Sequence, residues 1–238
     1  MTSGTPDDDI PAASEAGAEA QPPPAQEQQP EKKHKTAAGQ LFELVAIVAV
    51  ALGLALGIQA FLVKPYRIPS ESMLPTLQVG QRVLVDRIGS HFGSPDVGDV
   101  VVFHPPAPAN GEATGKGPGG QCGVDNDVGS PCPTAYPKRS DVNFIKRVVA
   151  GPGDTIAIVD GHVILNGKRQ DDSFTRPCQS GSDCTYRKPI TIPAGHWFMM
   201  GDNRGESDDS RFWGPIPKKW IIGGAFATYW PPKRIGTL

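Results

Sequence analysis

The chain has 238 residues, of which 38% are hydrophobic, and a formal net charge of −2. This length allows one medium-sized domain with appendages. No basic stripe with interleaved aromatic residues occurs, so we expect no nucleic-acid partner. The 28 glycines and 25 prolines indicate many turns and few long helices.

Residues 1–37 are rich in Pro, Gln, Ala, Glu and Asp and contain almost no large apolar side chains. Such a segment buries too little surface to offset the entropy that is lost when a chain becomes ordered. We therefore expect a disordered tail at the N-terminus.

A long apolar run follows the tail. From Leu41 to Val63 the chain is apolar apart from Glu43 and Gln59, and its last 20 residues would span about 30 Å as a helix, the thickness of a bilayer core. The apolar region of a cleavable signal peptide is shorter, roughly 7–15 residues. We therefore favour an uncleaved transmembrane anchor over residues 38–63, with a buried core helix as the alternative.

Basic residues lie on both sides of the run: Lys32, Lys33 and Lys35 before it, and Lys64 and Arg67 after it. The count favours a cytoplasmic N-terminus. With a single span, the rest of the chain then lies outside the cytoplasm, and we expect a single-pass protein of the plasma membrane. The four cysteines agree with an oxidising compartment.

The cysteines flank two short loops, one between Cys122 and Cys132 and one between Cys178 and Cys184. Among the three possible connectivities we prefer local pairing within each loop. A zinc site is the competing interpretation, but there is no C-x-x-C spacing and no histidine close to either pair. We expect neither a metal nor a cofactor.

Short strands and turns dominate the sequence after the anchor. The expected strands are residues 82–88, 100–103, 143–150, 155–159, 162–165, 190–192, 197–200 and a final strand or strand pair over 220–230. Residues 105–140 and 170–189 interrupt this pattern, and we interpret them as surface insertions. No helix is indicated outside the apolar run, so the fold class is mainly β, with a domain over residues 64–238.

The segment directly after the anchor contains the first candidate catalytic group. Pro69 and Pro75 constrain the backbone around Ser70 and Ser72. A hydroxyl that is held rigidly in such a segment can act as a nucleophile. The alternative is a polar linker that leaves the membrane.

Lys146 lies among apolar residues in the expected strand 143–150. The alternation of the strand places Lys146, Phe144 and Val148 on one face. Burial would lower the pKa of the lysine amine, and a neutral amine near a serine hydroxyl can take its proton. The alternative is a lysine at a sheet edge whose amine reaches solvent.

The stretch from Met200 to Gly214 is unusually rich in hydrogen-bonding groups. It indicates either a solvated loop or a buried network in which Ser207 bonds the lysine amine and Asp209 pairs with Arg211. The sequence has no G-x-S-x-G, S-x-x-K, H-E-x-x-H or P-loop motif. A Ser-His-Asp triad is formally possible, although the histidines after the anchor lie beside turns or loops.

Four stretches together resemble the sequence boxes of bacterial type I signal peptidase, the leader peptidase. They are Ile68–Leu77, Gly98–Phe103, Phe144–Asp154 and Gly201–Gly214, in the family's order behind a membrane anchor. The resemblance covers nearly all of residues 41–230 outside the cysteine loops. It implies two antiparallel β-sheet regions and a membrane-bound serine endopeptidase that removes signal peptides after small-x-small (Ala-x-Ala) sites.

The resemblance also implies a role for each site residue. Ser72 would attack the scissile carbonyl, and uncharged Lys146 would be the general base. The Ser72 backbone N–H and the Ser70 hydroxyl would form the oxyanion hole. Ser207 would orient Lys146, supported by Asp209 and Arg211. The substrate groove would be lined by Tyr66, Ile68, Met73, Leu77, Phe144 and Ile145.

We expect the partners to be signal-peptide-bearing preproteins, with the export machinery nearby, and the lipid bilayer, and we expect a monomer. Trp197, Phe212, Trp213 and Trp230 would contact the bilayer if exposed and would belong to the core if buried. Two other functions are considered. A repressor-type self-cleaving Ser-Lys protease is disfavoured by the membrane span. A non-catalytic anchored β-domain would need neither a buried Lys146 nor two serines between prolines.

Overall fold

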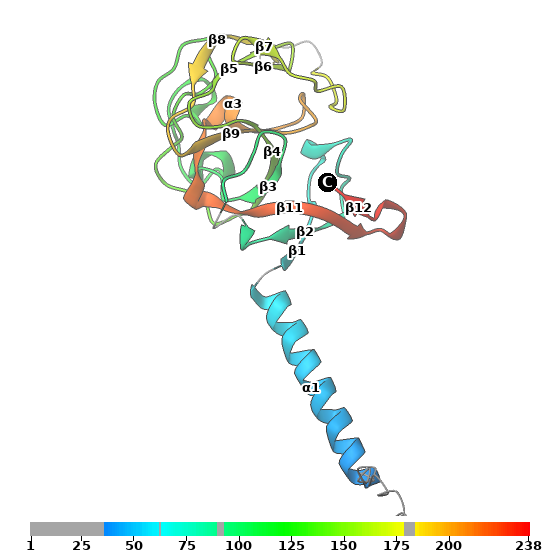
Figure 1. The fold of residues 1–238 in the computed structure, drawn as a ribbon. Coiled ribbons are helices and arrows are strands. Elements are labelled where there is room, and N and C mark those ends of the chain that lie inside the picture. The colour runs from blue at the N-terminus through cyan, green and yellow to red at the C-terminus, as the bar shows by residue number, and fades with distance from the viewer. Residues whose placement is uncertain (1–35, 62, 90–92, 179–183) are drawn as a thin grey trace, which may run out of the picture. The chain divides into compact units, whose positions relative to one another are not determined.

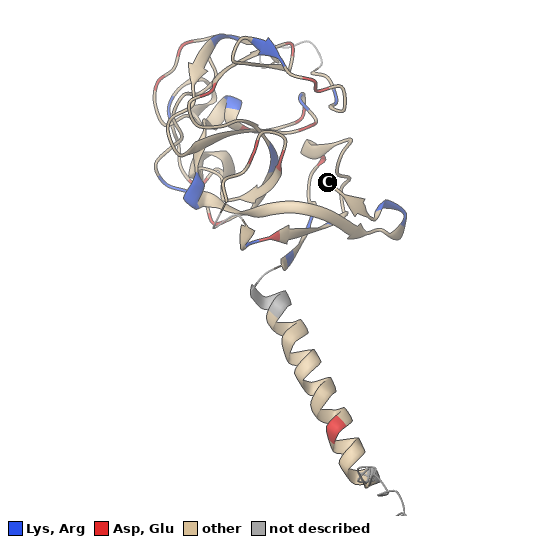
Figure 2. Ribbon diagram, in the orientation of Figure 1, with Lys and Arg blue, Asp and Glu red and all other residues tan. Residues whose placement is uncertain are grey.

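The computed structural model describes residues 36–61, 63–89, 93–178 and 184–238 (Figure 1). The tail expected over residues 1–37 lies almost wholly outside these ranges, so its disorder stays a prediction. Helix α1 (Ala37–Phe61) contains a 20-residue window, Ala38–Gly57, that is long and apolar enough to cross a membrane. Glu43 is the one charged residue in the described part of the helix (Figure 2). A helix satisfies its own backbone hydrogen bonds, as a membrane-spanning segment must.

The region after the helix is mainly β, which confirms the predicted fold class (Figure 1). One eight-stranded antiparallel sheet has the order β1-β2-β11-β3-β4-β9-β10, with β12 paired to β11. Its strands are β1 (Val63–Arg67), β2 (Arg82–Asp86), β3 (Val100–Phe103), β4 (Phe144–Ala150), β9 (His196–Met200), β10 (Ile216–Pro217), β11 (Ile221–Trp230) and β12 (Gly236–Thr237).

A second, four-stranded antiparallel sheet has the order β7-β6-β5-β8. Its strands are β5 (Thr155–Val159), β6 (His162–Leu165), β7 (Lys168–Arg169) and β8 (Tyr186–Thr191). Figure 1 shows this sheet at the opposite end of the β region from β1 and β2. Two sheet regions are what the resemblance implies.

Strands β3 and β4 lie between two apolar clusters. Val100, Val102 and Ile145 face one cluster, which also contains Met73 and Leu77. Alternate residues of the same strands face the other cluster, which contains Val101, Phe103, Val148, Trp197, Met199, Trp213, Ile216 and Trp220. Lys146 therefore belongs to a strand that is covered on both sides, where an ionised amine is costly.

Several elements differ from those expected from the sequence. Strand β1 forms where the sequence indicates only a segment leaving the membrane, and its Pro65 is tolerated because β1 is at the edge of the sheet. Strand β8 begins at Tyr186, inside the presumed insertion 170–189. A short helix, α3 (Ser210–Trp213), is capped by the side chain of Asp209. Four residues are too few to show helical periodicity in a sequence.

The aromatic residues divide between core and surface. Trp197 and Trp213 are 4% and 0% exposed and pack in the cluster beside β3 and β4, so the hypothesis that they contact a bilayer is wrong. Phe212 is partly buried against the same cluster. Trp230 is half exposed.

Candidate active site

The segment with the two serines leaves the sheet and re-enters it within a few residues. The backbone N–H of Ile68 donates to the carbonyl of Gln81 at 2.8 Å, which closes the segment into a loop. A single 3₁₀ turn, η1 (Glu71–Met73), follows Ser70, whose backbone is extended. Ser72 lies in this turn and is buried, with its Oγ 3.2 Å from the Oγ of exposed Ser70. The two hydroxyls are thus adjacent, as an oxyanion donor and a nucleophile would be.

Asn203 holds the main chain of this turn. Its backbone N–H donates to the carbonyl oxygen of Ser72 at 3.0 Å, and its side-chain Nδ2 donates to the carbonyl oxygen of Glu71 at 3.1 Å. In contrast, the backbone N–H of Ser72 donates no hydrogen bond within the described ranges. That N–H is available to an oxyanion.

Gly201 allows this close approach. A Cβ atom at Gly201 would collide with the carbonyl oxygen of Ser72 on one side and with Oγ of Ser207 on the other. Both colliding groups are parts of the proposed site. Only a residue without a side chain permits the segment 201–207 to lie against the serine turn.

Lys146 is buried, with 4% of its surface exposed, and its Nζ lies 5.8 Å from the centre of the Phe144 ring. Across the sheet it pairs with Val101. Among the described residues its amine forms no ion pair, because Asp202 and Asp209 pair with arginines instead. The pKa of Lys146 is lowered to about 8, chiefly by burial and to a smaller extent by Arg211, whereas Asp209, Asp208 and Asp202 oppose the shift. The amine is therefore neutral in a useful fraction of molecules near neutral pH.

Ser72 and Lys146 line the same pocket, which has a volume of about 330 Å³. No hydrogen bond joins their side chains in the part of the chain that the structure describes. A long nucleophile–base distance is common before substrate binds, because such contacts tighten in the complex. The residues that line the pocket are Pro69, Ser70, Ser72, Asn143, Phe144, Ile145, Lys146, Glu206 and Asp208.

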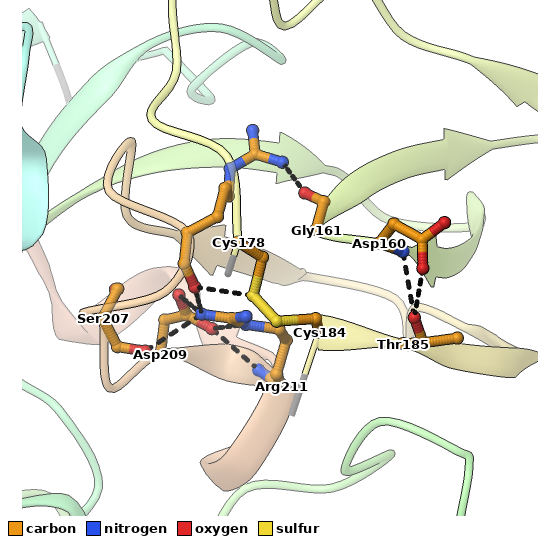
Figure 3. Close-up of a disulfide and its surroundings, with 9 residues drawn as sticks. Asp160, Gly161, Cys178, Cys184, Thr185, Ser207, Asp209 and Arg211 are labelled. Atoms are coloured by element: carbon orange, nitrogen blue, oxygen red, sulfur yellow. Dashed lines mark hydrogen bonds and ion pairs between the residues drawn. A yellow bond between two sulfur atoms is a disulfide. The ribbon is translucent and has the colours of Figure 1, made fainter. Parts of the chain in front are cut away.

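The polar stretch 200–214 forms a buried network rather than a solvated loop. Arg211 donates through Nε to Asp209 at 2.8 Å, and through one terminal nitrogen to the carbonyl oxygens of Arg204 (2.8 Å) and Ser207 (3.0 Å) (Figure 3). Asp209 also accepts from the backbone N–H of Gly201 at 3.1 Å. Burial alone raises the pKa of Asp209, but the charge and hydrogen bonds of Arg211 outweigh it and hold that pKa below its usual value.

Ser207 is held by its backbone. Its Oγ is buried and has no hydrogen-bond partner among the described residues. Arg211 donates to the carbonyl oxygen of Ser207, and Gly201 lies against its Oγ. The hydroxyl therefore has a fixed position although it makes no hydrogen bond in the described ranges. Its proposed bond to the amine of Lys146 stays a prediction.

Each of the two cysteine loops contacts this network. The structure contains the disulfides Cys122–Cys132 and Cys178–Cys184, the local pairs that the sequence favours. Cys132 donates its backbone N–H to the carbonyl of Arg211 at 3.0 Å. Figure 3 shows the second disulfide beside the network.

Arg204 connects the second loop to the network. Its guanidinium donates to Asp172 at 3.1 Å, to the carbonyl oxygen of Gly161 and, through Nε, to the carbonyl oxygen of Gly201 at 3.1 Å. Sγ of Cys178 lies 3.7 Å from the carbonyl oxygen of Arg204. The first loop also contacts strand β8, which follows the second loop, because Lys188 of β8 pairs with Asp127 at 3.1 Å.

The residues expected to line the substrate groove divide into two that line the pocket and four that belong to or pack against the core. Phe144 and Ile145 line the pocket. Ile68, Met73 and Leu77 are almost fully buried in the cluster beside β2, β3 and β11, against which Tyr66 packs. These four support the wall from the core side, and their direct contact with a substrate stays a prediction.

No described histidine lines this pocket. His162 is paired with Asp172 at 2.8 Å, and the rings of His104 and His196 hydrogen-bond backbone carbonyls. His34 and His91 lie outside the described residues. Among the described residues, a Ser-His-Asp triad at Ser72 therefore has no support.

Several contributors to the site were not singled out from the sequence. Gly201, Asn203 and Arg204 belong to the stretch whose polarity signalled a network, but nothing local shows which groups they contact. Asp208 lines the pocket and accepts a 3.4 Å hydrogen bond from Gln121, which directly precedes the first cysteine loop. No sequence pattern signals that contact, because the loop is irregular.

Known proteins are similar to the chain along most of its length. The model of the family described as "Signal peptidase, peptidase S26" matches residues 41–230. A signal peptidase I of Leptolyngbya laminosa is 35% identical over 218 residues, which covers 92% of each chain. A probable signal peptidase I-1 of Synechocystis sp. is 37% identical and covers 82% of this chain and 86% of its own. A signal peptidase I of Pseudomonas aeruginosa is 30% identical and covers 79% of this chain and 72% of its own.

Proposed function

Since the chain belongs to the signal peptidase family, peptidase S26, and removes signal peptides as a serine peptidase, we propose that Ser72 is its nucleophile and the uncharged amine of Lys146 its general base. The observation that carries this proposal is a buried lysine, with a pKa of about 8, in the same pocket as a buried serine. A lysine in solution has a pKa of about 10.4, so near pH 8 it would be protonated and unable to accept a proton.

In the proposed reaction, Nζ of Lys146 accepts the proton of Ser72 Oγ as that oxygen attacks the scissile carbonyl carbon. The oxyanion accepts hydrogen bonds from the Ser72 backbone N–H and the Ser70 hydroxyl. The ammonium then gives its proton to the leaving amine as the C–N bond breaks, and an ester remains on Ser72. Water that is deprotonated by Lys146 hydrolyses the ester and restores both groups.

Ser207, Asp209 and Arg211 have supporting roles in this proposal. The hydroxyl of Ser207, which has no partner among the described residues, would form a hydrogen bond with Lys146 Nζ once a substrate closes the pocket. Asp209 and Arg211 keep the backbone around Ser207 in place, because the guanidinium bridges the carboxylate and two carbonyl oxygens.

The substrate would bind as an extended strand. Alternate side chains of a strand point to the same side, so the first and third residues before the cut would face the groove together. The walls made by Phe144 and Ile145, supported by Ile68, Met73 and Leu77, favour small apolar groups there. This is the basis for proposing cleavage after Ala-x-Ala.

The location of the catalytic region is also part of the proposal. One apolar helix supports membrane anchoring, and Ser72 follows the expected anchor by nine residues in the sequence. The two disulfides favour an oxidising compartment. We therefore propose a cytoplasmic N-terminus and an extracytoplasmic catalytic region of a monomer, with the bilayer and exported preproteins as its partners.

The direct test uses the purified full chain in detergent and a preprotein with an Ala-x-Ala site. We expect cleavage after the second Ala, and its loss in Ser72→Ala and in Lys146→Ala. Full activity in Ser72→Ala would overturn the assignment of the nucleophile. Lys168→Gln, an exposed change in strand β7 of the second sheet, is the control and retains activity.

A further inference from the structure

Three carboxylates act on the amine of Lys146, namely those of Asp209, Asp208 and Asp202. Two of them have a cation of their own. Asp209 pairs with Arg211 at 2.8 Å, and Asp202 pairs with Arg147 at 2.7 Å. Asp208 has no cationic partner within the described ranges. Among the three, it is the carboxylate that forms no ion pair with an arginine in the described ranges.

The position of Asp208 is also distinctive. It lines the pocket that Ser72 and Lys146 share. Its Oδ2 accepts a hydrogen bond from Nε2 of Gln121 at 3.4 Å, and its Oδ1 is buried without a partner among the described residues. A buried carboxylate oxygen without a donor is costly, so the site keeps it at the expense of stability.

The backbone on both sides of Asp208 is fixed. Arg211 holds the carbonyl oxygen of Ser207, and the side chain of Asp209 is held by Arg211 and Gly201. The carboxylate of Asp208 therefore cannot move away from the pocket by a shift of its main chain. Its distance from the reacting groups is set by the same network that positions Ser207.

We propose that Asp208 is a positioning residue of the cleavage reaction, whose carboxylate stabilises the ammonium that forms on Lys146 when it takes the proton of Ser72. This inference rests on the proposed roles of Ser72 and Lys146. A fixed negative charge beside a developing cation lowers the energy of the transition state, as the aspartate does for the histidine of a Ser-His-Asp triad.

The charge states of the two groups fit this role. The pKa of Asp208 is raised to about 6, chiefly by burial and then by Asp209, while Lys146, Gln121 and Arg211 oppose the rise. Lys146 loses its proton near pH 8. Asp208 is thus ionised throughout the range in which neutral Lys146 becomes available. Glu206 lines the same pocket but is exposed, so water screens its charge.

The test compares the pH dependence of kcat/KM of the full chain in detergent with that of Asp208→Asn. Loss of the negative charge lowers the pKa of Lys146, so the rise of activity with pH moves down by roughly half a pH unit or more. The plateau at high pH falls several-fold, since the ammonium of the transition state loses its counter-charge. A merely structural role would lower the plateau without moving the pH of the rise.

Two further variants make the outcome decisive. Asp208→Ala shifts the rise in the same direction, so poor folding of one variant does not leave the question open. Glu206→Gln leaves the rise at its wild-type pH. The inference about Asp208 is wrong if activity in folded Asp208→Asn and Asp208→Ala rises at the wild-type pH. The proposed function still stands in that case, provided that Ser72→Ala and Lys146→Ala are inactive. Activity in Ser72→Ala would instead overturn the proposed function.

Discussion

Asn203 donates its backbone N–H to the carbonyl oxygen of Ser72 at 3.0 Å. This bond joins the turn that carries the proposed nucleophile to the stretch that carries Ser207. The side chain of Asn203 adds a second bond, to the carbonyl oxygen of Glu71 at 3.1 Å. The two parts of the site are thus fixed to each other through the main chain rather than through their reactive side chains.

Asn203→Ala removes the side-chain bond and keeps the backbone bond. We expect kcat to fall about tenfold, because small displacements of a nucleophile are costly, and stability to fall by about 1 kcal/mol. Steady-state cleavage of a preprotein and thermal unfolding measure both. Asn110→Ala is the control, since it removes only an exposed bond to Glu112 at 2.9 Å. Wild-type kcat in Asn203→Ala would contradict a role for this clamp.

Gly201→Ala tests the close approach of the two segments. The new Cβ would collide with the carbonyl oxygen of Ser72 and with Ser207, so the segments must separate. We expect kcat to fall about a hundredfold and stability to fall by about 1–3 kcal/mol. Gly224→Ala is the matched control, because a Cβ there has nothing within 4 Å. Equal activity of the two variants would show that the approach is not needed.

The strands that the sequence predicts well are those with strong local patterns. The alternation around Lys146 correctly places it on the face of Phe144 and Val148, because side chains alternate strictly along a strand. The short spacings within each cysteine loop also favour the pairs that the structure contains. Each of these inferences needs only a few neighbouring residues.

The contacts that complete the site are not local, and the sequence alone could not indicate them. Gly201 is required by the approach of Ser72, which lies far away along the chain. The bond between Gln121 and Asp208 joins an irregular loop to the pocket. Strand β1 forms by pairing with β2, whereas Pro65, taken by itself in the sequence, argues against a strand there. Such features follow from tertiary packing, which overrides local preference.

The second disulfide should support the site through Arg204. We expect Cys178→Ser with Cys184→Ser to lower stability by about 2 kcal/mol, because the unfolded chain gains freedom. Catalysis should fall as well, since Cys178 lies against the carbonyl of Arg204, to which Arg211 also donates. Thermal unfolding and kcat of the detergent-solubilised chain check both effects. Full activity and an unchanged melting temperature would contradict the supporting role.

The activity of the wild-type chain should rise with pH. Burial lowers the pKa of Lys146 to about 8, and only its neutral form accepts a proton. We expect kcat/KM to increase about tenfold per pH unit well below pH 8 and to level off above it. A peptide substrate without groups that titrate between pH 6 and 10 isolates the enzyme's contribution. A flat profile across pH 6–9 would exclude a lysine base.

Lys146→Met should abolish cleavage and stabilise the fold at neutral pH. The pKa of Lys146 falls from 10.5 to about 8 on folding, so between these values the unfolded chain binds more protons and stability rises with pH. Below pH 8 the wild-type chain bears the full free-energy cost of burying a protonated lysine, on the order of 3 kcal/mol. Methionine has a similar size and no charge, so the variant avoids this cost. Thermal unfolding should therefore favour the variant at pH 7 and much less at pH 10. Lys219→Met, an exposed change, should show no such dependence. A less stable Lys146→Met at pH 7 would mean that the amine is not held at a cost to the fold.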